Sequence, residues 1–343
     1  MTVPTPFITA LPRPYLLFLG DTSIQGFAKT AFGLKDWAPD LCVGEFALAG
    51  ATVTTGLPRL SPAEAYEKGA RALVIGVASL GGALDDSWVS ALVEALEAGL
   101  DIVSGMHTRL LALPDVAAAA ARTGRRLIEV RQPPTGLPIG TGRKRTGKRL
   151  LTVGTDCALG KKYTALALTR AFQERGLAAD FRATGQTGIM IAGSGLPLDA
   201  VVSDFLAGAA ETLSPDAAPD HWDVVEGQGS LFHPAYAGVS LGLLHGTQPD
   251  VFVLCHEPGR TDMIGTAGYL LPSLAETIDL TLRLGRRTNP AIHCAGISLN
   301  TSHLSDAETL AALAEAERET GLPAADPIKG GHAFLRLVES CLA

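Results

Sequence analysis

Short apolar segments alternate with amphipathic segments along the whole chain, and this alternation limits the folds that the sequence can adopt. The apolar segments are rich in β-branched residues, as expected for strands that are buried on both faces. The predicted strands are residues 15–20, 72–78, 101–105, 127–130, 149–154, 180–184, 222–227, 250–255 and 291–299. Helices are predicted at residues 86–99, 161–176, 198–211, 238–245, 272–286, 305–320 and 331–341. The pattern predicts an α/β protein built on parallel sheets.

The length of the chain and one turn-rich segment indicate two domains. A chain of 343 residues is longer than a single hydrophobic core usually supports. Residues 132–149, QPPTGLPIGTGRKRTGKR, are rich in proline, glycine and basic residues and show no regular spacing of apolar residues. This composition is typical of a linker. We therefore predict one domain at residues 1–135, a linker at 136–148 and a second domain at 149–343.

Composition excludes several classes of protein. The 28 basic and 35 acidic residues give a formal net charge of -7, which offers no broad basic surface for nucleic acid. No apolar run approaches the roughly 20 residues that a membrane span needs, and the N-terminus lacks the pattern of a signal peptide. The five cysteines are scattered and form no CxxC pair, which argues against disulfides and zinc. We expect a cytoplasmic protein without a metal.

The stretch VGTDCALGKKYT at residues 153–164 is close to the phosphate-binding pattern GxxxxGK[ST] and follows a predicted strand. Thr155 takes the place of the first glycine, and Lys162 takes the place of the hydroxyl that normally binds magnesium. The variant GTDxxxGK resembles the loop of dethiobiotin synthetase. A second ammonium in place of the hydroxyl favours phosphates held without metal. The predicted cofactor-binding residues are Gly154, Thr155, Asp156, Gly160, Lys161, Lys162, Tyr163 and Thr164, with Asn300 as a candidate for the adenine edge.

Catalytic candidates follow the strand at residues 222–227. Glu226 lies at the end of that strand, where phosphate-loop proteins place a second acidic group. His233 could exchange a proton near neutral pH. Asp204, expected in the middle of helix 198–211 among apolar neighbours, is a third candidate. Asp199, at the start of that helix, is better explained as its N-cap residue.

Substrate-binding candidates lie at the carboxyl ends of the predicted strands, where open α/β sheets bind their ligands. The turn after Glu226 is rich in glycine, so its backbone N–H groups could approach a ligand closely. The full set of substrate-binding candidates is Arg182, Gln186, Gly227, Gln228, Gly229, Ser230, Glu257 and Arg260.

Several segments together resemble a family long described as a domain of unknown function, some of whose members are D-glutamate N-acetyltransferases. They are GTDCALGKKYTALAL, ATGQTGIMIAG, DAVVSDFLAGAAE, EGQGSLFHPAYAGVSLGLLHG and LCHEP. The resemblance covers the second half densely and the first half more loosely. It implies a Rossmann-like N-terminal domain and a C-terminal domain of the P-loop NTPase type.

The resemblance also implies transfer of an acetyl group from acetyl-CoA to the amine of D-glutamate. Paired lysines without a magnesium hydroxyl suit the pyrophosphate of coenzyme A. The expected partners are therefore an amino acid and acetyl-CoA, in a homo-oligomer. Two alternatives remain open at this point. One is a ligase or kinase that uses Mg-ATP at the same loop, and the other is a sensor that binds its ligand without turnover.

Overall fold

The computed structural model describes residues 10–77 and 84–343 and divides into two compact units. The first unit contains the described residues up to Pro133 together with Gln186–Pro197, and the second contains Pro134–Gly185 and Leu198–Ala343. The segment Gln186–Pro197 thus interrupts the second unit in sequence but belongs to the first by its contacts. Within the described residues, no helix has the length and apolar character that crossing a bilayer requires.

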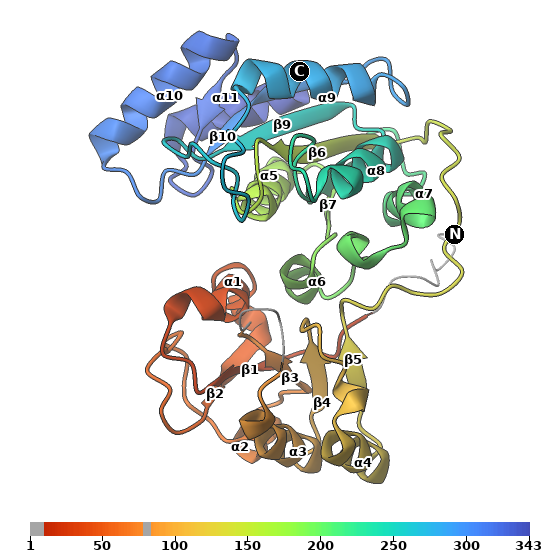
Figure 1. Ribbon diagram of the computed structural model, residues 1–343, viewed down its shortest axis with the longest axis vertical. Coiled ribbons are helices and arrows are strands. Elements are labelled where there is room, and N and C mark those ends of the chain that lie inside the picture. The colour runs from red at the N-terminus through yellow and green to blue at the C-terminus, as the bar shows by residue number, and fades with distance from the viewer. Residues whose placement is uncertain (1–9, 78–83) are drawn as a thin grey trace. The chain divides into compact units, whose positions relative to one another are not determined.

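The first unit is a parallel five-stranded sheet with helices, in the strand order β2-β1-β3-β4-β5 (Figure 1). Its strands are β1 (Tyr15–Gly20), β2 (Cys42–Ala47), β3 (Ala72–Ile75), β4 (Asp101–Ser104) and β5 (Leu127–Glu129). Its helices are α1 (Lys29–Trp37), α2 (Pro62–Glu67), α3 (Val89–Glu97), α4 (Pro114–Thr123) and α6 (Gln186–Ala192). All six residues of β1 are buried, as expected for the central part of a sheet covered on both faces.

Helix α6 is held to the first unit by hydrogen bonds from two parts of the chain. The Tyr15 hydroxyl donates to the carbonyl of Met190 at 3.1 Å. On α1, the hydroxyl of Thr30 lies 3.0 Å from that of Thr187. These contacts explain why the segment after β7 belongs with a sheet built from the first part of the chain. No helix was predicted at residues 185–195, which contain four glycines.

The second unit is a parallel six-stranded sheet in the order β11-β10-β9-β6-β8-β7. Figure 1 labels β10, β9, β6 and β7 of this sheet. Its strands are β6 (Lys148–Gly154), β7 (Ala179–Arg182), β8 (Trp222–Val225), β9 (Val251–His256), β10 (His293–Leu299) and β11 (Ala324–Ala325). Its helices are α5 (Lys161–Glu174), α7 (Ser203–Leu213), α8 (Ala237–Thr247), α9 (Leu274–Gly285), α10 (Asp306–Thr320) and α11 (Gly331–Leu342). The expected α/β fold with two parallel sheets is confirmed.

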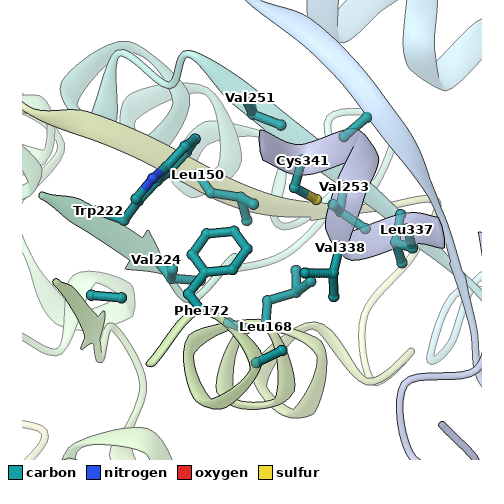
Figure 2. Close-up of a cluster of buried hydrophobic side chains, with 14 of the residues drawn as sticks. Leu150, Leu168, Phe172, Trp222, Val224, Val251, Val253, Leu337, Val338 and Cys341 are labelled. Atoms are coloured by element: carbon teal, nitrogen blue, oxygen red, sulfur yellow. The ribbon is translucent and has the colours of Figure 1, made fainter. Parts of the chain in front are cut away.

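The core of the second unit lies on both faces of this sheet. On one face, Leu168 and Phe172 of α5 pack with Val253 and with Leu337 of α11 (Figure 2). On the other face, Leu254 packs with residues of α9 and α10. Adjacent residues of β9 therefore enter different layers, because side chains alternate along a strand. Both faces need apolar residues, which accounts for the continuous apolar runs in the sequence.

The segment expected to be a linker is bound along the second unit. The buried guanidinium of Arg145 donates to the carbonyls of Ser214 at 2.7 Å and Gly246 at 2.8 Å. A side chain on Gly208 would meet the carbonyl of Pro138, so α7 and this segment touch through their backbones. Residues 138–147 form neither helix nor strand, but they are an ordered part of the second unit rather than a free connection.

Candidate functional site

The loop between β6 and α5 wraps tightly around the start of the helix. Strand β6 ends at Gly154 and α5 begins at Lys161, as the phosphate-loop pattern predicts. Gly160 has φ of 100° and Ala158 has φ of 54°, and such left-handed backbone is adopted readily by glycine but rarely by alanine. A Cβ on Gly154 would lie 3.0 Å from the Lys161 ammonium. The strand, loop and helix order that cradles phosphates is therefore present.

The Lys161 ammonium lies inside this loop. The residue is only 6% exposed, and its Nζ donates to the carbonyl of Asp156 at 2.6 Å. Burial lowers the pKa of Lys161 from its ordinary value, because a low-dielectric site disfavours the charged form. An anion in the loop would stabilise the ammonium and give it a stronger acceptor than a carbonyl.

Two threonine hydroxyls of the phosphate-loop motif, one in the loop and one in the first turn of α5, are engaged within the protein. Thr164 Oγ1 lies 2.8 Å from Ser298 Oγ on β10 and donates to the Gly160 carbonyl at 3.2 Å. Thr155 Oγ1 lies 2.9 Å from Nδ1 of His256. Both threonines are buried. Neither hydroxyl occupies the position next to Lys161 from which a phosphate loop supplies a magnesium ligand.

Lys162 stands in that position. Its Nζ lies 4.4 Å from the centroid of the Tyr163 ring, within the range of a cation–π interaction. Burial raises the pKa of the Glu226 carboxyl, and the positive charge of Lys162 offsets part of that rise. The residue predicted from its place in the loop motif is thus electrostatically linked to the predicted catalytic carboxylate.

Asp156, Arg260, Glu257 and Asn300 form a chain of polar contacts that braces the loop. Oδ2 of Asp156 accepts from Nη1 of Arg260 at 2.9 Å and from the backbone N–H of Ile264 at 2.8 Å. Arg260 donates to Glu257 at 2.8 Å, and Nδ2 of Asn300 donates to the same carboxylate at 3.2 Å. The structure brings these predicted ligand-binding residues together. In this arrangement their charged groups and the Asn300 amide form hydrogen bonds with one another.

The Glu226 carboxylate lies immediately after β8 and is buried, with 4% exposure. Its Oε2 accepts from the backbone N–H groups of Thr184 at 2.9 Å and Gly185 at 3.1 Å. These donors follow β7, the strand paired with β8. Burial raises the pKa of Glu226, while Lys162 and the two N–H donors lower it in part. A carboxylate with raised pKa is a suitable general base near neutral pH.

The glycine-rich turn after Glu226 is fixed to β6 and to the loop. The N–H of Gly227 donates to Thr152 Oγ1 at 2.9 Å, and a Cβ on Gly227 would lie 1.7 Å from the Thr152 carbonyl oxygen. Ser230 Oγ donates to the Thr155 carbonyl at 3.0 Å. Gly229 has φ of 59°. The close approach that the glycines permit is thus made to β6, and it places Gln228–Ser230 beside the loop.

His233 is buried and has both ring nitrogens in hydrogen bonds. Nδ1 accepts from the N–H of Ala235 at 3.1 Å, so the proton of the neutral ring is on Nε2, which donates to the carbonyl of Ile264 at 3.3 Å. A general base needs a nitrogen lone pair that can reach its substrate. The predicted role of His233 as a base therefore does not fit its contacts.

Three further predicted residues are exposed, paired with another side chain, or part of the first unit. Asp204 is exposed in the first turn of α7 rather than in mid-helix, because residues 198–200 form a separate short 3-10 turn before that helix. Arg182 donates to Asp223 Oδ1 at 2.6 Å, which directs its guanidinium back along β8. Gln186 belongs to the first unit and accepts from Arg131 Nε at 3.3 Å. These placements argue against the roles predicted for Asp204 and Arg182.

Three hydroxyl residues contribute to the site although the sequence analysis did not select them. Thr152 hydrogen-bonds to the turn at Gly227, and Ser298 hydrogen-bonds to Thr164 at the start of α5. Thr184 Oγ1 donates to the Glu226 carbonyl at 2.7 Å and accepts from Gln228 Nε2 at 2.9 Å. Each lies within or directly after a strand candidate. A hydroxyl in an otherwise apolar buried strand is the signal that could have identified Thr152 and Ser298.

Asp156, Cys157 and His233 bring a carboxylate oxygen, a thiol and an imidazole within 4.8 Å of one another. Arg260 and backbone N–H groups already bind the carboxylate, and Ala235 and Ile264 bind the imidazole. Burial raises the pKa of Cys157, which disfavours the thiolate that a metal would need. These three groups do not fit a metal in this arrangement. No disulfide joins the five cysteines, all of which are described.

Comparison with known proteins agrees with this architecture. Residues 138–336 match the family described as "Domain of unknown function (DUF1611_C) P-loop domain", and residues 46–133 match "Domain of unknown function (DUF1611_N) Rossmann-like domain". A relative from Tritonibacter scottomollicae named D-glutamate N-acetyltransferase is 52% identical over 97% of this chain and 99% of its own length. A Pseudoalteromonas relative with the same name is 48% identical over 93% and 96%.

The same family is represented among solved structures. The crystal structure of a DUF1611 family protein from Anabaena variabilis has a TM-score of 0.83 and 33% identity, and the match covers 95% of this chain and 99% of that one. The resemblance inferred from the loop and turn motifs is confirmed. This chain belongs to the DUF1611 family of proteins, which combine a Rossmann-like domain with a P-loop domain.

Proposed function

We propose that this protein is a D-glutamate N-acetyltransferase that takes its acetyl group from acetyl-CoA. The acceptor is proposed because two relatives that match nearly the full length of the chain carry that name. The donor is proposed from the loop. A phosphate cradle whose helix starts with Lys161 and Lys162, and whose hydroxyls are engaged elsewhere, suits a pyrophosphate that is bound without magnesium.

In this proposal the loop residues bind the coenzyme. Lys161 exchanges the Asp156 carbonyl for a phosphate oxygen, and Lys162 supplies a second positive charge. The loop N–H groups and the start of α5 add the partial positive charge of a helix N-terminus. We propose no metal and no other resident cofactor. The coenzyme would be held by its phosphates, while the reaction takes place at its thioester end.

Glu226 is the proposed general base. It takes a proton from the ammonium group of D-glutamate, and the resulting amine attacks the thioester carbonyl carbon. A C–N bond forms and the C–S bond breaks, and the departing thiolate takes up the proton that the attacking nitrogen loses as it becomes an amide. The raised pKa of Glu226 supports this role, because it brings the carboxylate nearer to the pKa of an amine than an exposed glutamate would be. N–H groups of the Gln228–Ser230 turn are proposed to stabilise the oxyanion.

A ligase or kinase that uses Mg-ATP is the competing function, because the loop resembles that of dethiobiotin synthetase. In that case Asp156 and Glu226 would be expected near the metal. The Asp156 carboxylate instead accepts from Arg260 and Ile264, which favours the acetyltransferase.

One set of measurements separates these functions. Calorimetric titration with acetyl-CoA should show binding that does not depend on magnesium, and acetylation of D-glutamate should be detected by mass in a panel of D- and L-amino acids. Binding of ATP only with magnesium, and none of acetyl-CoA, would support the ligase. Binding of acetyl-CoA without any acetylated product would indicate a sensor.

We also propose that the protein is a cytoplasmic homo-oligomer. The free state of all five cysteines suits a reducing compartment. Neighbouring Tyr269 and Leu270 are 53% and 72% exposed, and paired exposed apolar side chains are common in subunit interfaces. Light scattering coupled to size-exclusion chromatography measures the mass in solution; a monomer of 35.6 kDa would refute the oligomer.

A further inference from the structure

The strand order of the first unit defines a place where a ligand can bind. The chain runs from β1 to its neighbour β2 on one side and then returns to β3 on the other side of β1. The helices that follow these strands therefore leave the sheet in opposite directions. In sheets with the order 2-1-3-4-5, the crevice at the carboxyl ends of the first and third strands is the usual ligand site.

A cavity of about 320 Å³ opens at that position, a size within the usual range of small-molecule sites. Asp21 and Phe27, which follow β1, line it from one side. Val77, Asp85 and Trp88, which follow β3, line it from the other. We propose that this cavity binds a small organic cation, a molecule with an apolar body and a protonated amine. This site is built from residues of the first unit alone and goes beyond the proposed acetyl transfer.

The indole ring of Trp88, which lines the cavity, packs closely against a glycine. Gly20 has φ of 56°, and a Cβ there would lie 2.7 Å from the ring of Trp88. Trp88 is 4% exposed and lies edge-on to Phe18 with ring centroids 5.5 Å apart. Its Nε1 donates to Asp21 Oδ1 at 3.0 Å. The indole is therefore fixed by packing, and it positions the Asp21 carboxylate at the cavity.

The charge of the lining selects the ligand. Asp21 and Asp85 are its charged residues, and no Lys, Arg or His is among the described residues that line the cavity. A carboxylate has about four acceptor positions, of which the Trp88 N–H takes one at Asp21. Phosphates and dicarboxylates such as glutamate would be repelled. A protonated amine would pair with the carboxylates, while the rings of Phe27 and Trp88 favour an apolar or aromatic body.

Three probes with the same aromatic ring test this assignment. Tyramine carries an ammonium, tyrosol a neutral hydroxyl, and 3-(4-hydroxyphenyl)propionate a carboxylate. The chain has 3 tryptophans, so ¹⁹F spectra of full-length protein labelled with 5-fluorotryptophan have few signals. The signal of Trp88 is assigned by elimination with Trp37→Phe and Trp222→Phe, which leave the cavity intact.

We expect tyramine to shift the Trp88 signal saturably, tyrosol to bind more weakly, and the propionate not to bind. Asp21→Asn keeps an acceptor for the indole but removes the charge, and it should weaken tyramine binding about tenfold or more. Asp40→Asn, an exposed carboxylate outside the cavity, should not change it. The proposal is overturned if tyramine gives no saturable shift up to about 10 mM. It is also overturned if the propionate binds equally well or if Asp21→Asn binds as the unaltered protein does.

Discussion

Arg260 Nη1 lies 2.9 Å from Asp156 Oδ2, and this ion pair connects the phosphate loop with the segment that follows β9. The Asp156 side chain is fully buried, whereas Arg260 is 16% exposed. A buried carboxylate that loses its cation keeps its desolvation cost without compensation. The shape of the loop therefore depends on a residue far from it in sequence.

Arg260→Gln should lower the free energy of unfolding by about 3 kcal/mol, because it leaves the Asp156 carboxylate without its cation. Urea unfolding of Arg260→Gln, Asp156→Asn and the double variant measures this effect. The double variant should lose clearly less than the sum of the two single losses, since neither charge is then left alone. Strict additivity of the two losses would show that the pair is not coupled.

Gly227→Ala should disrupt the second unit. The new Cβ would lie 1.7 Å from the Thr152 carbonyl oxygen, so β6 or the turn must move, at a cost of at least about 3 kcal/mol. Gly238→Ala is the matched control, since a Cβ there meets nothing within 4 Å and the residue lies in helix α8. That control should stay within about 1 kcal/mol of the original protein. Thermal unfolding of both variants tests this prediction. Similar melting temperatures would contradict the close approach of Gly227 to Thr152.

Glu226→Gln should reduce the turnover of D-glutamate acetylation by about 10²-fold or more if Glu226 is the base. The raised pKa of this carboxyl also predicts the pH profile. Because the base acts unprotonated, turnover should fall as the pH decreases through a pKa above 4.5, the ordinary value for glutamate. Asp204→Asn makes the same chemical change at an exposed carboxylate in α7 and should leave turnover nearly unchanged. The opposite ranking of the two variants would remove Glu226 as the base and restore Asp204 as a catalytic candidate.

Lys162→Met should have two effects that can be measured separately. Loss of one phosphate-binding charge should weaken acetyl-CoA binding about tenfold, as seen by calorimetry. Loss of the charge that lowers the pKa of Glu226 should raise that pKa further and move the acidic limb of the pH–rate profile to higher pH. Lys35→Met, in helix α1 of the first unit, is the control for charge alone. If the acidic limb of the pH–rate profile does not move, Lys162 does not affect the pKa of Glu226.

His256 should make stability depend on pH. Burial lowers the pKa of His256 below its ordinary 6.5, so the folded protein favours the neutral ring. This contribution is complete above pH 6.5 and is lost as the pH falls through the lowered pKa of the folded state. Melting temperatures between pH 8 and pH 5 should fall less in His256→Gln than in the original protein. His332→Gln, at an exposed position in α11, should keep the original slope.

The periodicity of the sequence predicted most of the strands because buried parallel strands are continuously apolar. Strand β2 was missed, since Cys42–Ala47 lies at the edge of the sheet and only two of its residues are buried. Helix α6 was missed for another reason. Its glycines make it a weak helix by propensity, and contacts with residues of β1 and α1 stabilise it.

At the site, the sequence predicted the order of strand, loop and helix around GTDxxxGK and the place of Glu226 at the end of a strand, because both depend on local patterns. It could not give the directions of long side chains. Arg182 ends β7, but its partner Asp223 is set by the register between β7 and β8. His233 follows a glycine-rich turn, yet its role depends on Ala235 and Ile264, and the latter lies far along the chain. Such pairings depend on tertiary contacts that no local pattern contains.

The excursion of the chain at Gln186–Pro197 affects how this protein can be taken apart. The backbone passes from one unit to the other at residues 133–134, 185–186 and 197–198, so no single cut yields two complete halves. A fragment that stops at residue 135 would lack α6 and leave the hydroxyls of Tyr15 and Thr30 without their acceptor and neighbour. Gene fusions or split-protein designs based on this family should therefore carry residues 186–197 with the first half, joined through a new loop.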